Sequence, residues 1–369
     1  MKKLGEIFEI GSGGTPSKKH PEYYDGNIPW VKTGDLKDEY LYSVEDCISE
    51  EGLNNSSAKM YPSGTVLIAM YGATIGATSI LKFDACTNQA CAAFKPCEEV
   101  LPEYLYYFLR SKKQKFISDG VGGAQPNISA GYLKKVSIDI RNIKEQEKIV
   151  TVLDKLNGII QKRQNEVDEL DELIKARFVE LFGDLMENPL GWPVMTIADV
   201  STFLKSGLSR KLSDDDIGLP VIRSGNIQDG QFIFDDVKYW YIDDPQGANT
   251  KDYILNDGDV LVNFINSSSQ IGKTAIYRDT GRDCIYTTNI FRMKLADNCN
   301  EYYYNWFAMS DYYYRHLQRI IQPAVNQASF TTVNFLKLPI PLPPKEKQGK
   351  FADFVEQVDK SKVVALNAA

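Results

Sequence analysis

The sequence predicts an α+β fold in which one domain, built on a mixed or antiparallel sheet with helices, occurs twice and is followed each time by a helix. Three observations predict it: a long internal repeat, apolar strand-like runs that alternate with polar turns, and heptad spacing of aliphatic residues between the copies. The 369 residues exceed what one hydrophobic core usually supports and fit two domains with connecting helices.

The internal repeat consists of four short matches that occur in the same order. The matched ranges, first copy then second, are 28–36 and 219–227, 63–68 and 257–262, 87–89 and 288–290, and 145–149 and 347–351. The offset rises from 191 to 202, as loop insertions in a duplicated domain would produce. Repeats of solenoid proteins are 20–50 residues long, so this period indicates duplication of a whole domain.

Within each copy, apolar runs predict buried strands and aromatic-rich runs predict helices. Residues 65–70 and 260–265 have the composition of buried strands. Residues 101–110 and 301–309 have helical spacing, and we interpret their aromatic side chains as core residues rather than as surfaces for base stacking. Four prolines between 339 and 344 predict an extended entry into the last helix.

Between the copies, residues 145–182 predict one long helix with a coiled-coil seam. One seam position carries Ile149, Leu156, Arg163, Leu170 and Arg177, and the other carries Leu153, Ile160, Val167, Ile174 and Leu181. Gly183 and Pro189 end the helix, and Phe351, Val355 and Val358 repeat the start of the pattern near the C-terminus. The alternative is a helix lying on a domain core, but a helix of about 57 Å would extend past such a core.

Composition and charge exclude several classes of protein. A net charge of −7 disfavours a protein that coats nucleic acid without selectivity. No apolar run approaches the roughly 20 residues that span a bilayer, and the N-terminus lacks a secretion signal, so we expect a cytoplasmic protein. Cys86, Cys91 and Cys97 do not have the spacing of zinc ligands, and we interpret them as buried apolar residues.

Motifs for several kinds of enzyme are missing. The glycine-rich residues 11–15 do not match the dinucleotide-binding pattern, so we interpret them as a loop. Residues 272–274 resemble the end of a phosphate-binding Walker motif, but Ser267 stands where that motif needs glycine. The sequence also lacks the Asp/Asn-Pro-Pro-aromatic tetrapeptide of amino-methyltransferases, and its two histidines cannot form a histidine-rich metal centre.

Polar loops occur at matched positions in the two copies. They cover 11–19, 32–35, 70–76, 87–89 and 122–129 in the first copy, and 205–211, 223–226, 263–273, 288–289 and 324–332 in the second. Their Arg and Lys side chains can donate hydrogen bonds to guanine, and their Asn and Gln side chains can form hydrogen bonds with adenine. All of these side chains can also bind phosphates. Such loops are also common as plain solvated turns, so composition alone leaves both interpretations open.

The order of these motifs resembles the DNA-specificity subunit of a Type I restriction–modification system along essentially the whole chain. In the first copy the likeness is carried by Ile10–Ser17, Trp30–Asp35, Ala73–Gly76, Asn88-Gln89 and Glu145-Gln146. In the second it is carried by Ser206-Gly207, Ile271-Gly272, Thr288-Asn289 and Pro343-Pro344, with Lys347-Gln348 in place of the Glu-Gln pair.

The resemblance implies that each copy is a target recognition domain that reads one half of a bipartite, asymmetric DNA site. It implies that the two helices pair as an antiparallel coiled coil, set the spacer between half-sites and dock modification subunits. Those partners would supply methyl transfer from S-adenosylmethionine, and a restriction subunit would supply cleavage that depends on ATP and Mg. No catalytic residue, metal or cofactor is expected in this chain. Because the last helix is short, we expect the uncovered part of the seam on the first helix to be covered by a modification subunit or by a second copy of this chain.

The resemblance also implies domain limits and site residues. The expected parts are 1–142 (first recognition domain), 143–183 (spacer helix), 184–192 (linker), 193–344 (second recognition domain) and 345–369 (distal helix). The residues expected to contact DNA are Lys18, Lys19, Lys32, Thr33, Tyr71, Thr74, Asn88, Gln89, Gln125, Asn127, Arg210, Lys211, Arg223, Asn226, Asn263, Gln270, Lys273, Asn289, Asn326 and Gln327. The expected helix seam is Ile149, Leu153, Leu156, Ile160, Val167, Leu170, Ile174, Leu181, Phe351, Val355 and Val358.

The alternative functions are a fused DNA methyltransferase or nuclease and a coiled-coil scaffold that does not contact DNA.

Overall fold

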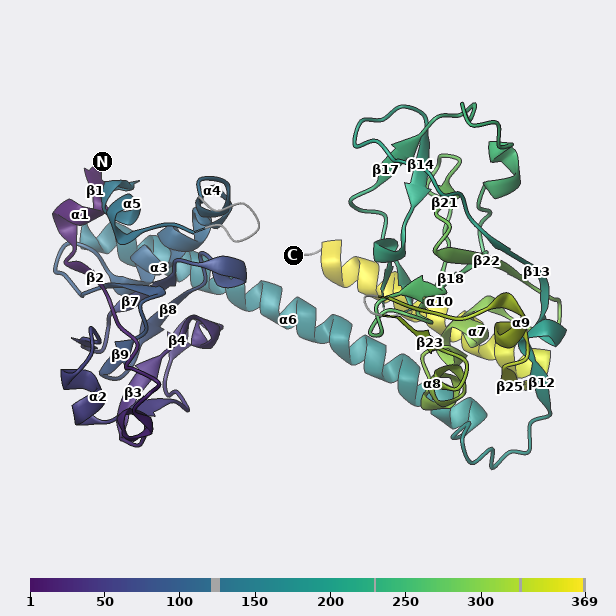
Figure 1. Ribbon diagram of the computed structural model, residues 1–369, viewed down its shortest axis with the longest axis horizontal. Coiled ribbons are helices and arrows are strands. Elements are labelled where there is room, and N and C mark those ends of the chain that lie inside the picture. The colour runs from purple at the N-terminus through teal and green to yellow at the C-terminus, as the bar shows by residue number, and fades with distance from the viewer. Residues whose placement is uncertain (121–126, 229, 325–326, 368–369) are drawn as a thin grey trace. The chain divides into compact units, whose positions relative to one another are not determined.

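The computed structural model describes residues 1–120, 127–228, 230–324 and 327–367. The chain divides into two compact units, Met1–Gln161 and Lys162–Ala369, and the boundary lies inside the long helix α6 (Ile143–Phe182) (Figure 1). Each half of α6 packs with its own neighbours, and the five-part division expected from the sequence stays a prediction. None of the described helices combines the length and the hydropathy needed to cross a membrane.

Unit 1 combines helices with two mixed sheets. Its strands are β1 (Lys2–Lys3), β2 (Ile10–Ser12), β3 (Ile28–Val31), β4 (Tyr40–Leu41), β5 (Cys47–Ile48), β6 (Met60–Tyr61), β7 (Val66–Ala69), β8 (Thr78–Leu81), β9 (Ala85–Thr87), β10 (Cys91–Phe94) and β11 (Ser137–Ile138). Its helices besides α6 are α1 (Leu4–Ile7), α2 (Glu50–Asn54), α3 (Pro102–Ser111), α4 (Lys113–Ser118) and α5 (Ala130–Lys135), with 3-10 turns η1 (Pro21–Tyr24), η2 (Thr33–Asp35) and η3 (Gly72–Thr74).

Both faces of strand β7 are buried, which explains its unbroken apolar sequence. Val66 and Ile68 join the cluster beneath α3, α4 and α5, whereas Leu67 and Ala69 join a second cluster shared with strands β3 and β9. The five-stranded sheet has the order β2-β10-β7-β8-β4, and the four-stranded sheet has the order β5-β3-β9-β6. Unit 1 is thus a layer of helices, a central sheet and a second sheet.

Unit 2 contains a second set of strands and helices. Its strands are β12 (Val194–Thr196), β13 (Ser201–Ser206), β14 (Leu219–Ile222), β15 (Ile227–Gln228), β16 (Gln231–Phe232), β17 (Lys238–Trp240), β18 (Val260–Asn263), β19 (Ile265–Asn266), β20 (Thr274–Ile276), β21 (Ile285–Tyr286), β22 (Ile290–Leu295), β23 (Gln322–Pro323), β24 (Ala328–Ser329) and β25 (Pro339–Pro341). Its helices are α7 (Glu301–Phe307), α8 (Asp311–Gln318), α9 (Thr332–Leu336) and α10 (Lys345–Asn367), with 3-10 turns η4 (Ile197–Val200), η5 (Ser224–Asn226) and η6 (Thr250–Tyr253).

The strand order confirms the predicted duplication. The order β13-β22-β18-β20 in unit 2 matches β2-β10-β7-β8 in unit 1, and β17-β14-β21 matches β5-β3-β9. Each unit also keeps one parallel pair at the same place, β3 with β9 and β14 with β21. The predicted α+β class is therefore correct, and the mixed sheets arise from this one parallel pair and from a second in unit 1, β4 with β8.

A buried glutamine joins the first turn of each long helix to its own unit. Gln146 accepts the backbone N–H of Leu101 at 2.9 Å and donates to the carbonyls of Glu99 and Arg141, both at 2.8 Å. Gln348 accepts the N–H of Asn300 at 2.8 Å and donates in the same way to two carbonyls. Both side chains are fully buried. The motif that the sequence marked as the start of each helix is thus a hydrogen-bonded junction.

Helix α10 runs antiparallel to the second half of α6, as predicted. The Phe351 ring lies 5.3 Å from Phe178 and 5.5 Å from Phe182, and further along α10 the Lys362 Nζ lies 2.7 Å from Asp171 Oδ1 (Figure 1). The core at the end of α6 is formed by Ile174, Phe178 and Phe182, which lie four residues apart. This spacing differs from the expected heptad because Phe178 also stacks on Tyr303 of α7. Here α6 lies on a domain core.

The expected seam residues differ in burial: those that face α10 are buried or pack against the core of unit 2, and those outside this core are half-buried or exposed. Phe351, Val355 and Val358 are buried with Ile174, and Leu170 and Leu181 pack against the same cluster. Ile149, Leu153 and Val167 are half-buried, whereas Leu156 and Ile160 are exposed.

Candidate nucleic-acid interface

In unit 1 the fold gathers the predicted polar loops at one edge. Strands β3 and β9 are parallel, so Lys32 after β3 and Asn88 after β9 emerge side by side, and the Asn88 N–H donates to the Val31 carbonyl at 2.9 Å. Strand β7 ends at the same place, where the Met70 N–H donates to the Ala90 carbonyl at 2.8 Å. The loops 32–35, 70–76 and 87–89 therefore form one continuous surface.

The glycine-rich loop joins this surface because glycine permits a close backbone approach. A Cβ atom on Gly13 would lie 1.7 Å from the Thr87 carbonyl oxygen, and one on Gly207 in unit 2 would lie 2.0 Å from the Tyr286 carbonyl oxygen. No other residue fits there. Next to Gly13, the Thr15 hydroxyl donates to the Gln89 side chain. This contact aligns the Gly13 loop with the tip that follows β9.

Unit 2 repeats the arrangement. The Thr287 N–H donates to the Ile222 carbonyl at 3.0 Å, and the Phe264 N–H donates to the Asn289 carbonyl at 3.1 Å. The Asn263 side chain donates to the Ser224 carbonyl at 3.3 Å. Loops 223–226, 263–273 and 288–289 therefore lie together, as do their counterparts in unit 1.

The predicted site residues differ in exposure. Exposed side chains belong to Lys18, Lys19, Tyr71, Gln89, Asn127, Lys211 and Gln327, and half-buried ones to Lys32, Thr33, Thr74, Asn88, Arg210, Arg223, Gln270, Lys273 and Asn289. Tyr71 and Asn127 lie side by side in an isolated β-bridge, and Thr74 donates to the Tyr71 carbonyl at 3.2 Å. Gln125 and Asn326 lie outside the described residues.

Asn226 and Asn263 are buried, so neither side chain can contact a base edge without a rearrangement. Asn226 is 2% exposed, accepts the Arg223 N–H at 2.8 Å and donates to the carbonyls of Ile233 and Asp235 at 2.9 and 2.8 Å. In unit 1 Asp35 accepts the Lys32 N–H in the same way. The sequence match of these two residues therefore reflects a loop-closing hydrogen bond, and Asn226 positions the loop.

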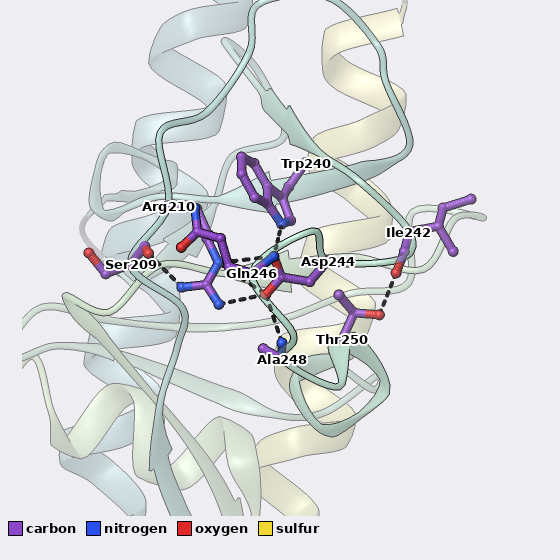
Figure 2. A network of polar contacts seen from close by, with 8 residues as sticks. All are labelled: Ser209, Arg210, Trp240, Ile242, Asp244, Gln246, Ala248 and Thr250. Carbon is purple, nitrogen blue, oxygen red and sulfur yellow. Dashed lines mark hydrogen bonds and ion pairs between the residues drawn. The ribbon is translucent and has the colours of Figure 1, made fainter.

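Arg210 is likewise held inside unit 2 (Figure 2). Its guanidinium lies 2.5 Å from a fully buried Asp244 oxygen, and this carboxylate also accepts from Trp240 at 3.2 Å and from the backbone of Gln246 and Ala248. Hydrogen bonding from Arg210 holds the pKa of Asp244 far below its usual range, and the same contact raises the pKa of Arg210. We therefore assign Arg210 to the support of its loop rather than to direct contact with DNA.

Two further aspartates, which sequence reasoning missed, pair with predicted DNA-contacting cations. Asp46 forms an ion pair with Lys32, and Asp236 forms one with Arg223 at 2.7 Å. Hydrogen bonding to Asp46 raises the pKa of Lys32. Asp46 and Asp236 are separated by 190 residues, and Lys32 and Arg223 by 191. A comparison of acidic residues between the two copies, extended beyond the polar loops, would therefore have found both aspartates.

Two of the three cysteines agree with the prediction that they are buried apolar residues, whereas Cys97 is half-buried. Cys86 and Cys91 are buried, and burial raises the pKa of both thiols to about 12. Such thiols stay protonated at neutral pH and are poor nucleophiles and metal ligands. Within the described part of the chain, no group of three or more His, Cys, Asp or Glu side chains has the arrangement of a metal site.

Comparison with curated proteins finds relatives over half or more of the chain. The chain is similar to the specificity subunit of the Type I restriction enzyme MjaIX of Methanocaldococcus jannaschii, at 32% identity over 256 residues that cover 63% of this chain and 59% of the relative. It is also 30% identical over 191 residues to the EcoR124I/EcoR124II specificity subunit of Escherichia coli, covering 50% of this chain and 47% of the relative. The chain thus spans about half the length of these curated relatives.

Solved structures share the fold. A Type-I restriction-modification S subunit from M. genitalium superposes with a TM-score of 0.51 at 13% identity, covering 100% of this chain and 91% of that one. A chain from a structure of the complex assembly and conformational transition of the type I R-M system superposes with a TM-score of 0.53 at 17% identity. This match covers 99% of the present chain and 92% of the other one. The family model described as "Type I restriction modification DNA specificity domain" matches residues 1–169 and again residues 189–368. The chain therefore belongs to the family of Type I restriction–modification DNA specificity domains.

Proposed function

We propose that this chain is the sequence-reading subunit of a Type I restriction–modification complex and that each unit reads one half of a bipartite DNA site. The observation that supports this most is the repeated loop surface: in both units, polar loops from the same strands meet at the same edge. The two surfaces carry different side chains, so the two half-sites differ and the target is asymmetric.

The proposed DNA contacts exclude Arg210, which is held by a buried carboxylate, and the buried side chains of Asn226 and Asn263. In unit 1 they are Lys18, Lys19, Lys32, Thr33, Tyr71, Thr74, Asn88, Gln89, Gln125 and Asn127. In unit 2 they are Lys211, Arg223, Gln270, Lys273, Asn289, Asn326 and Gln327. Arg210, Asn226 and Asn263 act indirectly, by holding the loops that carry these residues.

The chemistry belongs to partner subunits in this proposal. Modification subunits supply methyl transfer from S-adenosylmethionine, a restriction subunit supplies ATP- and Mg-dependent cleavage, and the assembly acts on DNA in the cytoplasm. The chain contributes recognition and docking only. Methyl transfer by the purified chain alone would instead support the fused-enzyme alternative.

Methylation mapping of host DNA tests the proposal. Tyr71→Ala with Asn127→Ala changes unit 1, and Gln270→Ala with Gln327→Ala changes unit 2. We expect each pair to alter or relax only one half of the methylated sequence. Gln114→Ala, an exposed change on α4 outside the loops, is the control and leaves the pattern unchanged. Relaxation of both halves by one pair contradicts the two-reader arrangement, and no change from either pair supports a scaffold without DNA contact.

Helix α6 sets the spacer between the half-sites in this proposal. Four residues inserted near Gln161 add about 6 Å and one helical turn. DNA rises about 3.4 Å per base pair, so the gap lengthens by at most about two base pairs. The same methylation mapping reports the gap directly, and an unchanged gap rules out the spacer role.

A further inference from the structure

In both units, a cation proposed to contact DNA is already paired with an aspartate of the same unit. Lys32 pairs with Asp46, and Arg223 donates through Nη2 to both the carboxylate and the carbonyl of Asp236. Lys32 also lies in the field of the Asp35 and Glu45 carboxylates. Both cations therefore sit in acidic surroundings, although DNA is a polyanion.

In both units the cation follows a strand and the acid precedes the antiparallel partner of that strand, although the two acids differ by two residues in the register. Lys32 directly follows β3, and Asp46 directly precedes β5, the antiparallel partner of β3. Arg223 directly follows β14, and Asp236 lies two residues ahead of β17, the antiparallel partner of β14. The same kind of pair thus occurs beside the matched strands of both units, with a lysine in one unit and an arginine in the other.

Stability gives little reason for these pairs. The side chains are 41% and 46% exposed in unit 1 and 32% and 80% exposed in unit 2, and ion pairs with this exposure contribute little to folding. Asp236 has a positive φ of 44°, a backbone conformation that aspartate and asparagine adopt more readily than most residues with a Cβ. A role at the DNA interface accounts better for both pairs.

We propose that Asp46 and Asp236 are specificity determinants that keep Lys32 and Arg223 from acting as phosphate clamps. This inference rests on the proposed function. A neighbouring carboxylate neutralises each cation and repels a phosphate, whereas the edge of a base is uncharged and is not repelled. Each cation keeps N–H groups beyond those bound to aspartate, since lysine has three and arginine has five. The paired cation therefore still donates hydrogen bonds to base edges, whereas its contact with phosphates is weak. Binding to DNA of random sequence is weak for the same reason.

Binding of the full-length chain to a random-sequence duplex over a range of salt concentrations tests the inference. We expect Asp46→Asn and Asp236→Asn each to tighten this binding by about tenfold at low salt. The slope of log affinity against log salt becomes steeper by about 0.9 for each phosphate gained. Asparagine keeps the shape of aspartate and tolerates the positive φ at residue 236, so the variants should fold.

Matched controls separate the ion pair from net charge alone. Asp235→Asn, next to Asp236, and the exposed Asp25→Asn change the charge equally and should alter binding less than twofold. In an Arg223→Gln background, Asp236→Asn should no longer tighten binding.

Three results would overturn the inference and leave the proposed function in place. The first is equal effects of Asp236→Asn and Asp235→Asn, and the second is an undiminished effect in the Arg223→Gln background. The third is loss of methylation at the second half-site without any gain on random DNA, which would mean that Asp236 orients Arg223. If no variant binds duplex DNA even at low salt, the two carboxylates do not limit binding and the inference fails, whereas the proposed function is decided separately by the methylation mapping.

Discussion

At the scale of single residues, Asn226 and Asp35 show how one position of the repeat serves the same purpose with different chemistry. Both accept the backbone N–H of the cation three residues earlier. Only Asn226 also donates, to the carbonyls of Ile233 and Asp235, and only Asn226 is buried. The two side chains therefore tolerate exchange differently.

We expect Asn226→Asp to lower the free energy of unfolding of unit 2 by about 2–4 kcal/mol, because it removes two donors and places a carboxylate against two carbonyls. Asp35→Asn, the reverse change in unit 1, keeps the acceptor and should cost less than about 1 kcal/mol. Denaturant unfolding of the two variants measures the difference. A stable Asn226→Asp protein with an altered second half-site would show instead that Asn226 reads DNA.

The buried carboxylate of Asp244 predicts a stability that depends on pH. Its pKa in the folded chain lies below the ordinary value of about 3.9, mainly because Arg210 donates to it. Its contribution is therefore complete above about pH 4 and is lost as the pH falls from there toward the folded pKa. We expect the urea midpoint of the wild type to approach that of Asp244→Asn as the pH drops from 4 to 3. Asp243→Asn, an exposed neighbouring change, should leave the pH profile unchanged.

At the scale of elements, each of the two buried glutamines connects a long helix to its own unit. Replacing Gln146 by leucine leaves the Leu101 N–H and two carbonyls without their partner, and Gln348→Leu does the same in unit 2. Each change should cost about 2–4 kcal/mol, because unsatisfied buried groups are expensive. Gln164→Leu, on the exposed surface of α6, should cost far less.

Hydrogen exchange locates the effect of these changes. Gln146→Leu should accelerate exchange at the start of α3 without changing α7, and Gln348→Leu should do the opposite. Simultaneous acceleration in both helices would mean that the two junctions are not independent.

The sequence predicted these elements better than it predicted their packing. The Gln motif marked both helix starts, yet its role depends on partners 45 and 48 residues away, such as Leu101 and Asn300. The heptad predicted α6, but Phe178 and Phe182 fell outside the expected seam because they pack on Tyr303 as well as on α10. The burial of Arg210 likewise depends on Asp244, 34 residues away.

At the scale of the whole molecule, duplication was the most predictable property, because two copies of one fold leave matches in the same order. The sequence placed the polar loops at matched positions, and the structure shows that they form two equivalent surfaces, since loops after matched strands must emerge at matched edges. The loop positions therefore followed from the sequence, whereas the exposure of each loop side chain did not. That exposure depends on which acid or carbonyl the fold brings within hydrogen-bond distance.

The first half of α6 exposes an apolar stripe that the described chain does not cover. Val152, Leu156, Ile159 and Ile160 are 45–55% exposed, while Val150 and Gln146 turn toward unit 1 and are buried. A fully exposed aliphatic side chain forfeits up to about 1.5–3 kcal/mol relative to burial. Contiguous exposed apolar residues on a helix are typical of an interaction surface. We expect a modification subunit to cover this stripe, with a second copy of the chain as the alternative.

Two variants of α6 test this expectation. Leu156→Asp with Ile160→Asp should stay folded and fail to co-purify with the modification subunit, because two carboxylates would be buried in the contact. Thr151→Asp with Lys155→Asp, on the exposed polar face of the same helix and with the same spacing, should fold and assemble normally. Circular dichroism and size-exclusion chromatography distinguish the outcomes.

Unfolding of the first variant would mean that the stripe packs on unit 1. Normal assembly by a folded variant would remove the docking role, and loss only of self-association would assign the stripe to a second copy of the chain.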